Sequence, residues 1–352
     1  KYMLCSNCFS QMLGSDGVFQ SGDETHLIPF NDHRGTSNEY HAFLNHEVVQ
    51  SYMLLGPAEA VNTFYRKDPQ FFERVKKLVV RGYNRFLEQY PVHPQKYSLA
   101  AWVWLNTAMY KMTKEEKYKE TAIKEAKRWM EIQVTENYAT TDFTVKGWYR
   151  RESGDINNPQ GEKPEQEVMI TPWIYQGMFR LINTFPEHED ASKWKNSVKL
   201  YAKDYLAKIA SLNVYGWTPM KVGKNGLSRN IGNIEYSYFA QIIGRTFHHL
   251  GNAAYLMKAA HLLGDKELKE TAWKQLYGFV GLNPIGIGFI NGFSHNEPRQ
   301  EYAEKYPIAK QYPGGVSNGL RGGLEDYFDF KTFEYYTYAN LNCLWMSTEL
   351  GY

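Results

Sequence analysis

The chain has 352 residues, of which 43% are apolar and 22% are charged, a composition typical of a folded globular protein rather than a disordered one. Forty Lys and Arg residues against 38 Asp and Glu residues leave a formal net charge of only +2. That balance argues against a dedicated nucleic-acid or anionic-membrane binder, and no apolar run reaches the roughly 18 residues of a membrane-spanning helix.

Apolar residues recur at helical spacing over most of the chain. The predicted helices, in chain order, span about 38–55, 68–89, 98–112, 114–134, 168–185, 190–212, 238–263, 266–280 and 333–350. We expect the first to end at Gly56-Pro57 and the second to start at Asp68-Pro69, because proline suits the first turn of a helix but not its interior. Most of these helices pair as antiparallel hairpins.

Three long segments, 135–167, 213–237 and 281–332, separate the hairpins and are rich in Gly, Pro, Asn and aromatic residues. Loops of this length inside a compact domain are usually functional or disordered, and their aromatic content disfavours disorder. Repeated hairpins with long loops predict an all-α fold, an (α/α)6-type toroid forming a single domain over 1–352. A ring of six hairpins needs twelve helices, so we expect the toroid to be incomplete at the N-terminus.

Two segments near the C-terminus carry a specific resemblance. The first runs from Ala272-Trp-Lys-Gln-Leu-Tyr-Gly-Phe-Val-Gly-Leu-Asn-Pro284 through Phe289-Ile-Asn-Gly-Phe293 to His295 and Arg299. The second is Gly322-Gly-Leu-Glu-Asp-Tyr-Phe-Asp329, followed by Glu334 and, six residues later, Asn340. Together they resemble the end of glycoside hydrolase family 9, the endoglucanase-type α/α barrels. The likeness is specific over about 237–342 and architectural before that.

The resemblance implies a glycosidase that cleaves a β-linked glycan by an inverting mechanism, with Glu334 as the general acid. The neighbours of this residue fit the role, because it lies between Phe333 and Tyr335. A carboxyl group among aromatic rings is poorly solvated, which raises its pKa and lets it hold a proton near neutral pH. The alternative is an ordinary Glu at a helix start.

The resemblance also implies that His295, Arg299 and Asn340 bind the sugar. The family usually has a longer loop that ends in His-His-Arg, whereas this chain has His295-Asn-Glu-Pro-Arg299. Aromatic residues make up 16% of the chain, and rings either fill cores or stack on sugars. The candidate sugar platforms in or beside the long loops are Trp148, Tyr149, Trp173, Trp217 and Tyr236, each with packing in the core as its alternative.

An inverting glycosidase needs a second carboxylate to activate water. The family supplies it from an Asp-Ala-Gly-Asp motif near the start of the domain, and this chain has no such motif. Gly22-Asp23-Glu24 and Gly154-Asp155 are only superficially similar. We therefore expect the base on an N-terminal segment that is absent from the chain, the other explanation being that the chemistry has changed.

Two other functions stay open. A polysaccharide lyase also suits an α/α toroid, and Arg34, Asn38, Tyr40 and His41 form a suggestive cluster. The second is a non-catalytic glycan-binding homologue that has lost the base.

We expect an oligo- or polysaccharide as the partner, no nucleic acid, no membrane span, and an extracytoplasmic or secreted location by the resemblance. The three cysteines, Cys5, Cys8 and Cys343, do not complete a zinc set, so neither a metal at the site nor a cofactor is expected, with a structural calcium ion left open.

Overall fold

The computed structural model describes residues 12–13, 19–20, 47–89, 96–139, 144–149, 175–211, 214–218, 228–231, 234–237, 246–283, 286–290, 292–293, 299–300, 314, 316, 320–322, 328–332 and 337–350. The chain divides into two compact units, which we describe one at a time. The first comprises Lys1–Glu131, Glu152–Ile156 and Gly177–His188, and the second comprises Ile132–Arg151, Asn157–Gln176 and Glu189–Tyr352.

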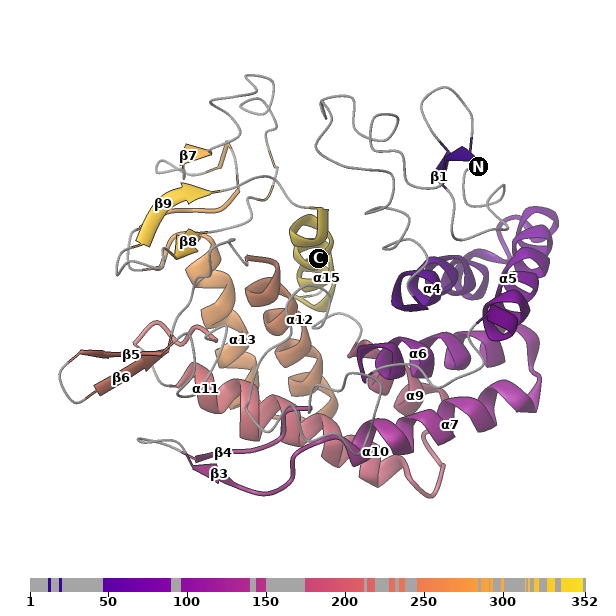
Figure 1. The fold of residues 1–352 in the computed structure, drawn as a ribbon, viewed down its shortest axis with the longest axis horizontal. Helices are drawn as coiled ribbons and strands as arrows, with labels where there is room; N and C mark the ends of the chain where they lie inside the picture. The colour runs from indigo at the N-terminus through magenta and orange to yellow at the C-terminus, as the bar shows by residue number, and fades with distance from the viewer. Residues whose placement is uncertain are drawn as a thin grey trace. The chain divides into compact units, whose positions relative to one another are not determined.

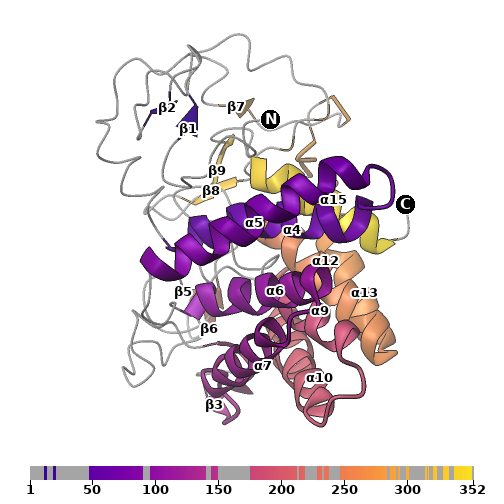
Figure 2. The same ribbon diagram turned by 90° about the vertical axis from the view of Figure 1, so that its right-hand side faces the viewer.

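The first unit is built on helices that pack around α6 (Figure 2). Its described helices are α4 (Glu47–Phe64), α5 (Pro69–Gln89), α6 (Lys96–Thr113), α7 (Glu116–Glu131) and nearly all of α9 (Gln176–Thr184). The strands β1 (Met12–Leu13) and β2 (Phe19–Gln20) pair antiparallel. Every residue from Leu99 to Met109 is buried, which makes α6 the central helix of this unit.

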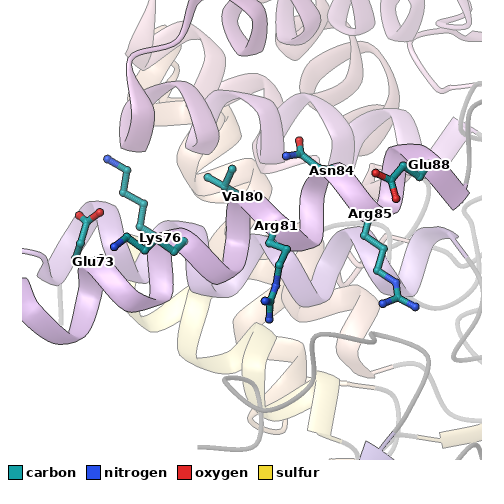
Figure 3. Close-up of a pocket in the computed structure, with 8 residues that line it drawn as sticks. Glu73, Lys76, Val80, Arg81, Asn84, Arg85 and Glu88 are labelled. Carbon is teal, nitrogen blue, oxygen red and sulfur yellow. The ribbon is translucent and has the colours of Figure 1, made fainter.

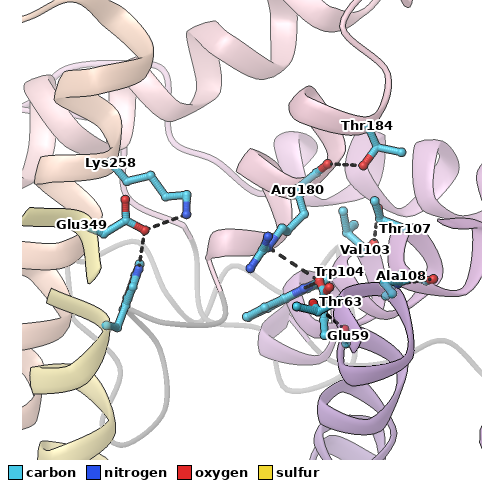
Figure 4. A network of polar contacts seen from close by, with 12 residues as sticks. Glu59, Thr63, Val103, Trp104, Thr107, Ala108, Arg180, Thr184, Lys258 and Glu349 are labelled. Atoms are coloured by element: carbon cyan, nitrogen blue, oxygen red, sulfur yellow. Dashed lines mark hydrogen bonds and ion pairs between the residues drawn. The ribbon is translucent and has the colours of Figure 1, made fainter. Parts of the chain in front are cut away.

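Close contacts and polar ties fix the neighbours of α6. A Cβ atom at Gly177 would lie 2.5 Å from the Ala100 carbonyl oxygen, so only glycine allows α9 to come this close to α6. The Trp104 indole nitrogen donates a hydrogen bond of 2.5 Å to Glu59 on α4, and the Arg180 Nε lies 3.6 Å from the same carboxylate (Figure 4). The resulting tie joins three helices of the first unit.

The predicted end of the first helix at Gly56-Pro57 is wrong. Helix α4 continues through Pro57 to Phe64. Leu54, Ala58 and Val61 are buried on one face of α4, and this face packs against α6. The burial of a continuous apolar face outweighs the missing N–H group of one proline. The predicted start of the next helix is confirmed, because the Asp68 carboxylate accepts a hydrogen bond of 2.9 Å from the Phe71 N–H just ahead of α5.

The second unit contains a helical rod, a hairpin and the last helix (Figure 1). The rod is α10 (Ala191–Lys199), the π-helical stretch η1 (Leu200–Ala207) and α11 (Lys208–Ala210). The hairpin is α12 (Thr246–Leu263) and α13 (Lys266–Phe279), which lie side by side in Figure 1, and α15 (Thr337–Leu350) also packs against α12. These helices agree with the predictions for 190–212, 238–263, 266–280 and 333–350 wherever the structure describes them.

Short strands occupy the three segments predicted as long loops. Two antiparallel pairs are β3 (Tyr138–Ala139) with β4 (Thr144–Val145) and β5 (Ser228–Ile231) with β6 (Ile234–Ser237). A three-stranded sheet has the order β7 (Arg299–Gln300), β9 (Phe328–Thr332) and β8 (Leu320–Gly322). Among the described residues, no helix is long and apolar enough to cross a membrane.

Candidate functional site

The three-stranded sheet lies directly ahead of the predicted general acid. Strand β7 pairs in parallel with β9, with Arg299 opposite Lys331, and β9 ends at Thr332, two residues before Glu334. Paired strands lie about 5 Å apart and each further residue spans at most about 3.5 Å. The backbone of Arg299 therefore lies within roughly 9 Å of that of Thr332, the last described residue before Glu334.

The last helix, which carries Asn340 in its first turn, is held in place by a polar tie near its other end. The Lys258 ammonium lies 2.7 Å from the Glu349 carboxylate, and the Trp345 indole donates to the same oxygen at 2.9 Å (Figure 4). Only 18% of the Lys258 side chain and 14% of the Glu349 side chain are exposed. An ion pair so little exposed to water is screened weakly by salt, and it joins α15 to α12.

The Gly-x-Asn-Pro turn after α13 is closed by its own asparagine. The Asn283 amide donates to the Gly278 and Ile287 carbonyl oxygens at 2.8 Å and 2.7 Å, and its oxygen accepts from the Ile287 N–H at 3.2 Å. Gly281 has a φ of +129°, a conformation that side chains rarely adopt. The sequence motif contains Asn283 without assigning it a role. In the structure its side chain ties Gly278 at the end of α13 to Ile287 beyond the turn.

Trp217, one of the predicted platforms, is a core residue that covers the end of α13. Its ring stacks on His249 with centroids 4.7 Å apart, and it is 4% exposed. It also lies directly against Gly278, where a Cβ atom would overlap the indole ring. A sugar stacks only on an exposed ring face, so this burial favours the packing alternative.

Trp148 and Tyr149 pack against the helical rod. They are 2% and 3% exposed, and the Tyr149 hydroxyl lies 3.1 Å from the Ser197 hydroxyl. The Tyr149 ring also contacts Tyr175 and Tyr201, and burial raises the pKa of the Tyr149 hydroxyl well above its ordinary value. Packing in the core accounts for these two rings as well.

Gln133 fixes the segment that carries these rings. Its amide donates to the Gly147 carbonyl oxygen at 2.8 Å and to the Ser197 carbonyl oxygen at 3.0 Å. The Ser197 hydroxyl donates back to the Gln133 side-chain oxygen at 2.7 Å. Sequence reasoning missed Gln133, since a single glutamine after a helix gives no signal of its partners.

The remaining predicted site residues lie outside the described parts of the chain. These are Glu334, His295 and Trp173, together with the side chains of Arg299, Tyr236 and Asn340. The cluster proposed for a lyase, from Arg34 to His41, and the segments around Asp23 and Asp155 also lie outside. In the described part of the chain, no group of three or more His, Cys, Asp or Glu side chains could hold a metal ion.

Comparisons with known proteins identify the fold. No protein-family model matches the sequence, and neither does any curated protein. Solved structures do match. The family 9 endoglucanase J30 is 16% identical, with a TM-score of 0.56, over 86% of this chain and 54% of that one. The endoglucanase of the termite Nasutitermes takasagoensis is 14% identical, with a TM-score of 0.55, over 87% of this chain and 66% of that one.

A third match is endoglucanase CelQ from Clostridium thermocellum, solved with cellobiose and cellotriose, at 13% identity and a TM-score of 0.52. The match extends over 87% of this chain and 48% of CelQ. The chain thus spans about half to two thirds of the length of these endoglucanases. The predicted all-α toroid is confirmed: the chain has the fold of the glycoside hydrolase family 9 endoglucanases, an (α/α)6 barrel.

Proposed function

We propose that this protein hydrolyses a β-linked glycan of the cellulose type with inversion at the anomeric carbon, and that Glu334 is the general acid. The observation that carries the proposal is the pairing of β7 with β9 in a chain that has the endoglucanase fold. This pairing brings the backbone of Arg299 beside β9, the strand that precedes Glu334 in the sequence. Helix α15, which contains Asn340, begins three residues after Glu334.

In this mechanism Glu334 donates its proton to the glycosidic oxygen as the bond from that oxygen to the anomeric carbon breaks. Arg299, His295 and Asn340 hold sugar hydroxyls, and water attacks the opposite face of the ring. A polymeric glycan does not cross a membrane, so the proposal includes action outside the cytoplasm.

The central experiment is Glu334→Gln, assayed with azide as the nucleophile on β-glucan and on an aryl β-glucoside with a highly acidic leaving group. Loss of the acid should lower kcat on the glucan by roughly 10²- to 10⁴-fold. The aryl substrate should lose far less, because its leaving group departs without a proton. Glu270→Gln, an exposed Glu on α13, is the matched control and should leave both rates unchanged.

Two results would overturn the assignment. Unchanged turnover of every glycan by Glu334→Gln would remove this residue from the mechanism. An unsaturated product that absorbs in the ultraviolet, formed from a uronate polymer, would make the protein a lyase instead.

The proposal takes the general base from a segment N-terminal to the printed residues, because the printed sequence has no Asp-Ala-Gly-Asp motif. Azide is a nucleophile that needs no base, so it should restore cleavage by the printed chain. It would bond to the anomeric carbon while Glu334 gives its proton to the departing oxygen, and the product would be an α-glycosyl azide. If these 352 residues hydrolysed the glycan fully without azide, the general base would lie among them.

A further inference from the structure

One face of α5 forms the wall of an open groove of about 910 Å³ (Figure 3). The residues that line it recur every three or four positions along the helix, so they share one face. Within the described part of the chain, they are Glu73, Lys76, Lys77, Val80, Arg81, Asn84, Arg85 and Glu88.

Cations form a regular row along this face. Lys77, Arg81 and Arg85 are all exposed and follow one another at intervals of four residues, so each step along the helix axis is about 6 Å. Figure 3 shows Arg81 and Arg85 projecting from the same side of α5. Glu73 and Glu88 stand at the two ends of the groove-lining face and bound the cationic stretch.

The row differs from an ordinary solvated helix face. On α7, Lys119 pairs with Glu116 and Arg128 pairs with Glu125, each within one turn. Among the described residues, no ion pair holds Lys77, Arg81 or Arg85. Like charges four residues apart on a helix repel each other and destabilise it. A ligand with a matching row of negative charges would remove this repulsion.

We propose that the α5 groove binds a linear anionic polysaccharide, a uronate-containing glycan whose carboxylates pair with Lys77, Arg81 and Arg85. The groove lining also offers the Asn84 amide, which can hydrogen-bond hydroxyl groups, and Val80, which can contact the apolar face of a sugar ring. The choice of a glycan among linear polyanions rests on the proposed function, whereas the binding of a polyanion rests on the groove alone. The nearly balanced charge of the whole chain makes such a local row stand out, and it argues against nucleic acid as the ligand.

The test is calorimetric titration with oligogalacturonate of the Glu334→Gln protein, in which the proposed mechanism slows any hydrolysis. The triple variant Lys77→Gln/Arg81→Gln/Arg85→Gln should bind roughly tenfold more weakly than its parent, since each exposed ion pair contributes modestly. Binding by the parent should weaken as salt rises, and the triple variant should lose most of this salt dependence.

The matched control removes three other cations of the same unit, Lys111, Lys124 and Lys127, which are exposed on α6 and α7. Lys111→Gln/Lys124→Gln/Lys127→Gln changes the net charge equally and should leave the affinity within about twofold of the parent. Equal losses in both triple variants, or no binding by the parent, would overturn the groove as a polyanion site. Equal binding of polyglutamate would overturn the choice of a glycan and leave Glu334 as the general acid untouched.

Discussion

The two units use their buried polar side chains differently. In the first unit these groups bond along a helix or to a neighbouring helix. The buried Asn106 amide donates to the Trp102 carbonyl oxygen at 2.9 Å, and the half-buried Asn62 amide donates to that of Ala108 at 3.0 Å. In the second unit, buried amides bond to the backbone of irregular segments. Gln133, Gln275 and Asn283 all do so.

The difference follows from the kind of backbone that each unit buries, helical in the first and partly irregular in the second. Helices satisfy their own backbone groups, so packing them needs little beyond apolar faces. An irregular segment that is buried leaves N–H and C=O groups without helical partners, and each one must find a hydrogen bond elsewhere. A glutamine or asparagine supplies a donor and an acceptor together, which suits it to this task. We therefore expect amide replacements to cost more in the second unit than in the first.

Gln275→Leu should have the largest effect. The Gln275 side chain is fully buried, its oxygen accepts from the Thr218 N–H at 2.8 Å, and its amide donates to the Gly216 carbonyl oxygen. Leucine would leave both backbone groups buried without this partner, which should lower the free energy of unfolding by about 3 kcal/mol. Urea unfolding measures the loss, and hydrogen exchange at the Thr218 N–H should accelerate. An unchanged exchange rate there would contradict the proposed role of the amide.

Asn106→Leu is the matched replacement in the first unit and should cost less, about 1.5 kcal/mol. The Trp102 carbonyl oxygen lies inside α6 and keeps its place in the helical hydrogen-bond ladder. Only the Tyr83 hydroxyl, which donates to Asn106 at 2.6 Å, would lose its partner. The double variant Tyr83→Phe/Asn106→Leu should recover part of the loss, because it removes both polar groups. If Asn106→Leu lowered the free energy of unfolding as much as Gln275→Leu, amide replacements would not cost more in the second unit than in the first.

The same contrast explains how far the sequence predicts the fold. The hairpin helices α6, α7, α12 and α13 follow from helical spacing of apolar residues, because that pattern reports directly on a buried face. The continuation of α4 through Pro57 was not predictable. It depends on packing against α6, and the residues next to the proline carry no signal of that contact.

The candidate site is predictable in part. The motif around Asn283 predicts a turn, and the structure confirms a turn there, but the partners of its amide lie on backbone groups that no motif specifies. Aromatic residues in long loops suggest sugar platforms, yet Trp148, Tyr149 and Trp217 are buried. Composition does not distinguish a ring that fills a core from one that faces a ligand, because both are apolar and flat. Glu334 as the acid stays a prediction.

Asp265 tests the comparison between the two units with the smallest expected effect, because its side chain joins two helices of the second unit. Its carboxylate caps α13 by accepting from the Glu267 and Leu268 N–H groups at 3.0 Å and 3.2 Å, and it pairs with Lys203 on η1 at 2.8 Å. The hydrogen bond from Lys203 lowers the pKa of Asp265, with smaller contributions from the backbone N–H groups. Asp265→Asn keeps a capping side chain but removes the charge, so the loss of stability at pH 7 should be smaller than that of Asn106→Leu.

The sign of the pH dependence follows from the lowered pKa. The folded state binds a proton at Asp265 less readily than the unfolded chain, whose aspartate pKa is about 3.9. The stability that this charge contributes is therefore fully present above that value and is lost as the pH falls through the lower pKa of the folded state. The difference in unfolding free energy between the parent and Asp265→Asn should stay constant from about pH 7 to pH 5 and shrink below about pH 4. Urea unfolding across this range measures it, with Lys203→Gln as the partner variant. A difference that grew on acidification would show that the charge of Asp265 is not what joins α13 to the rod.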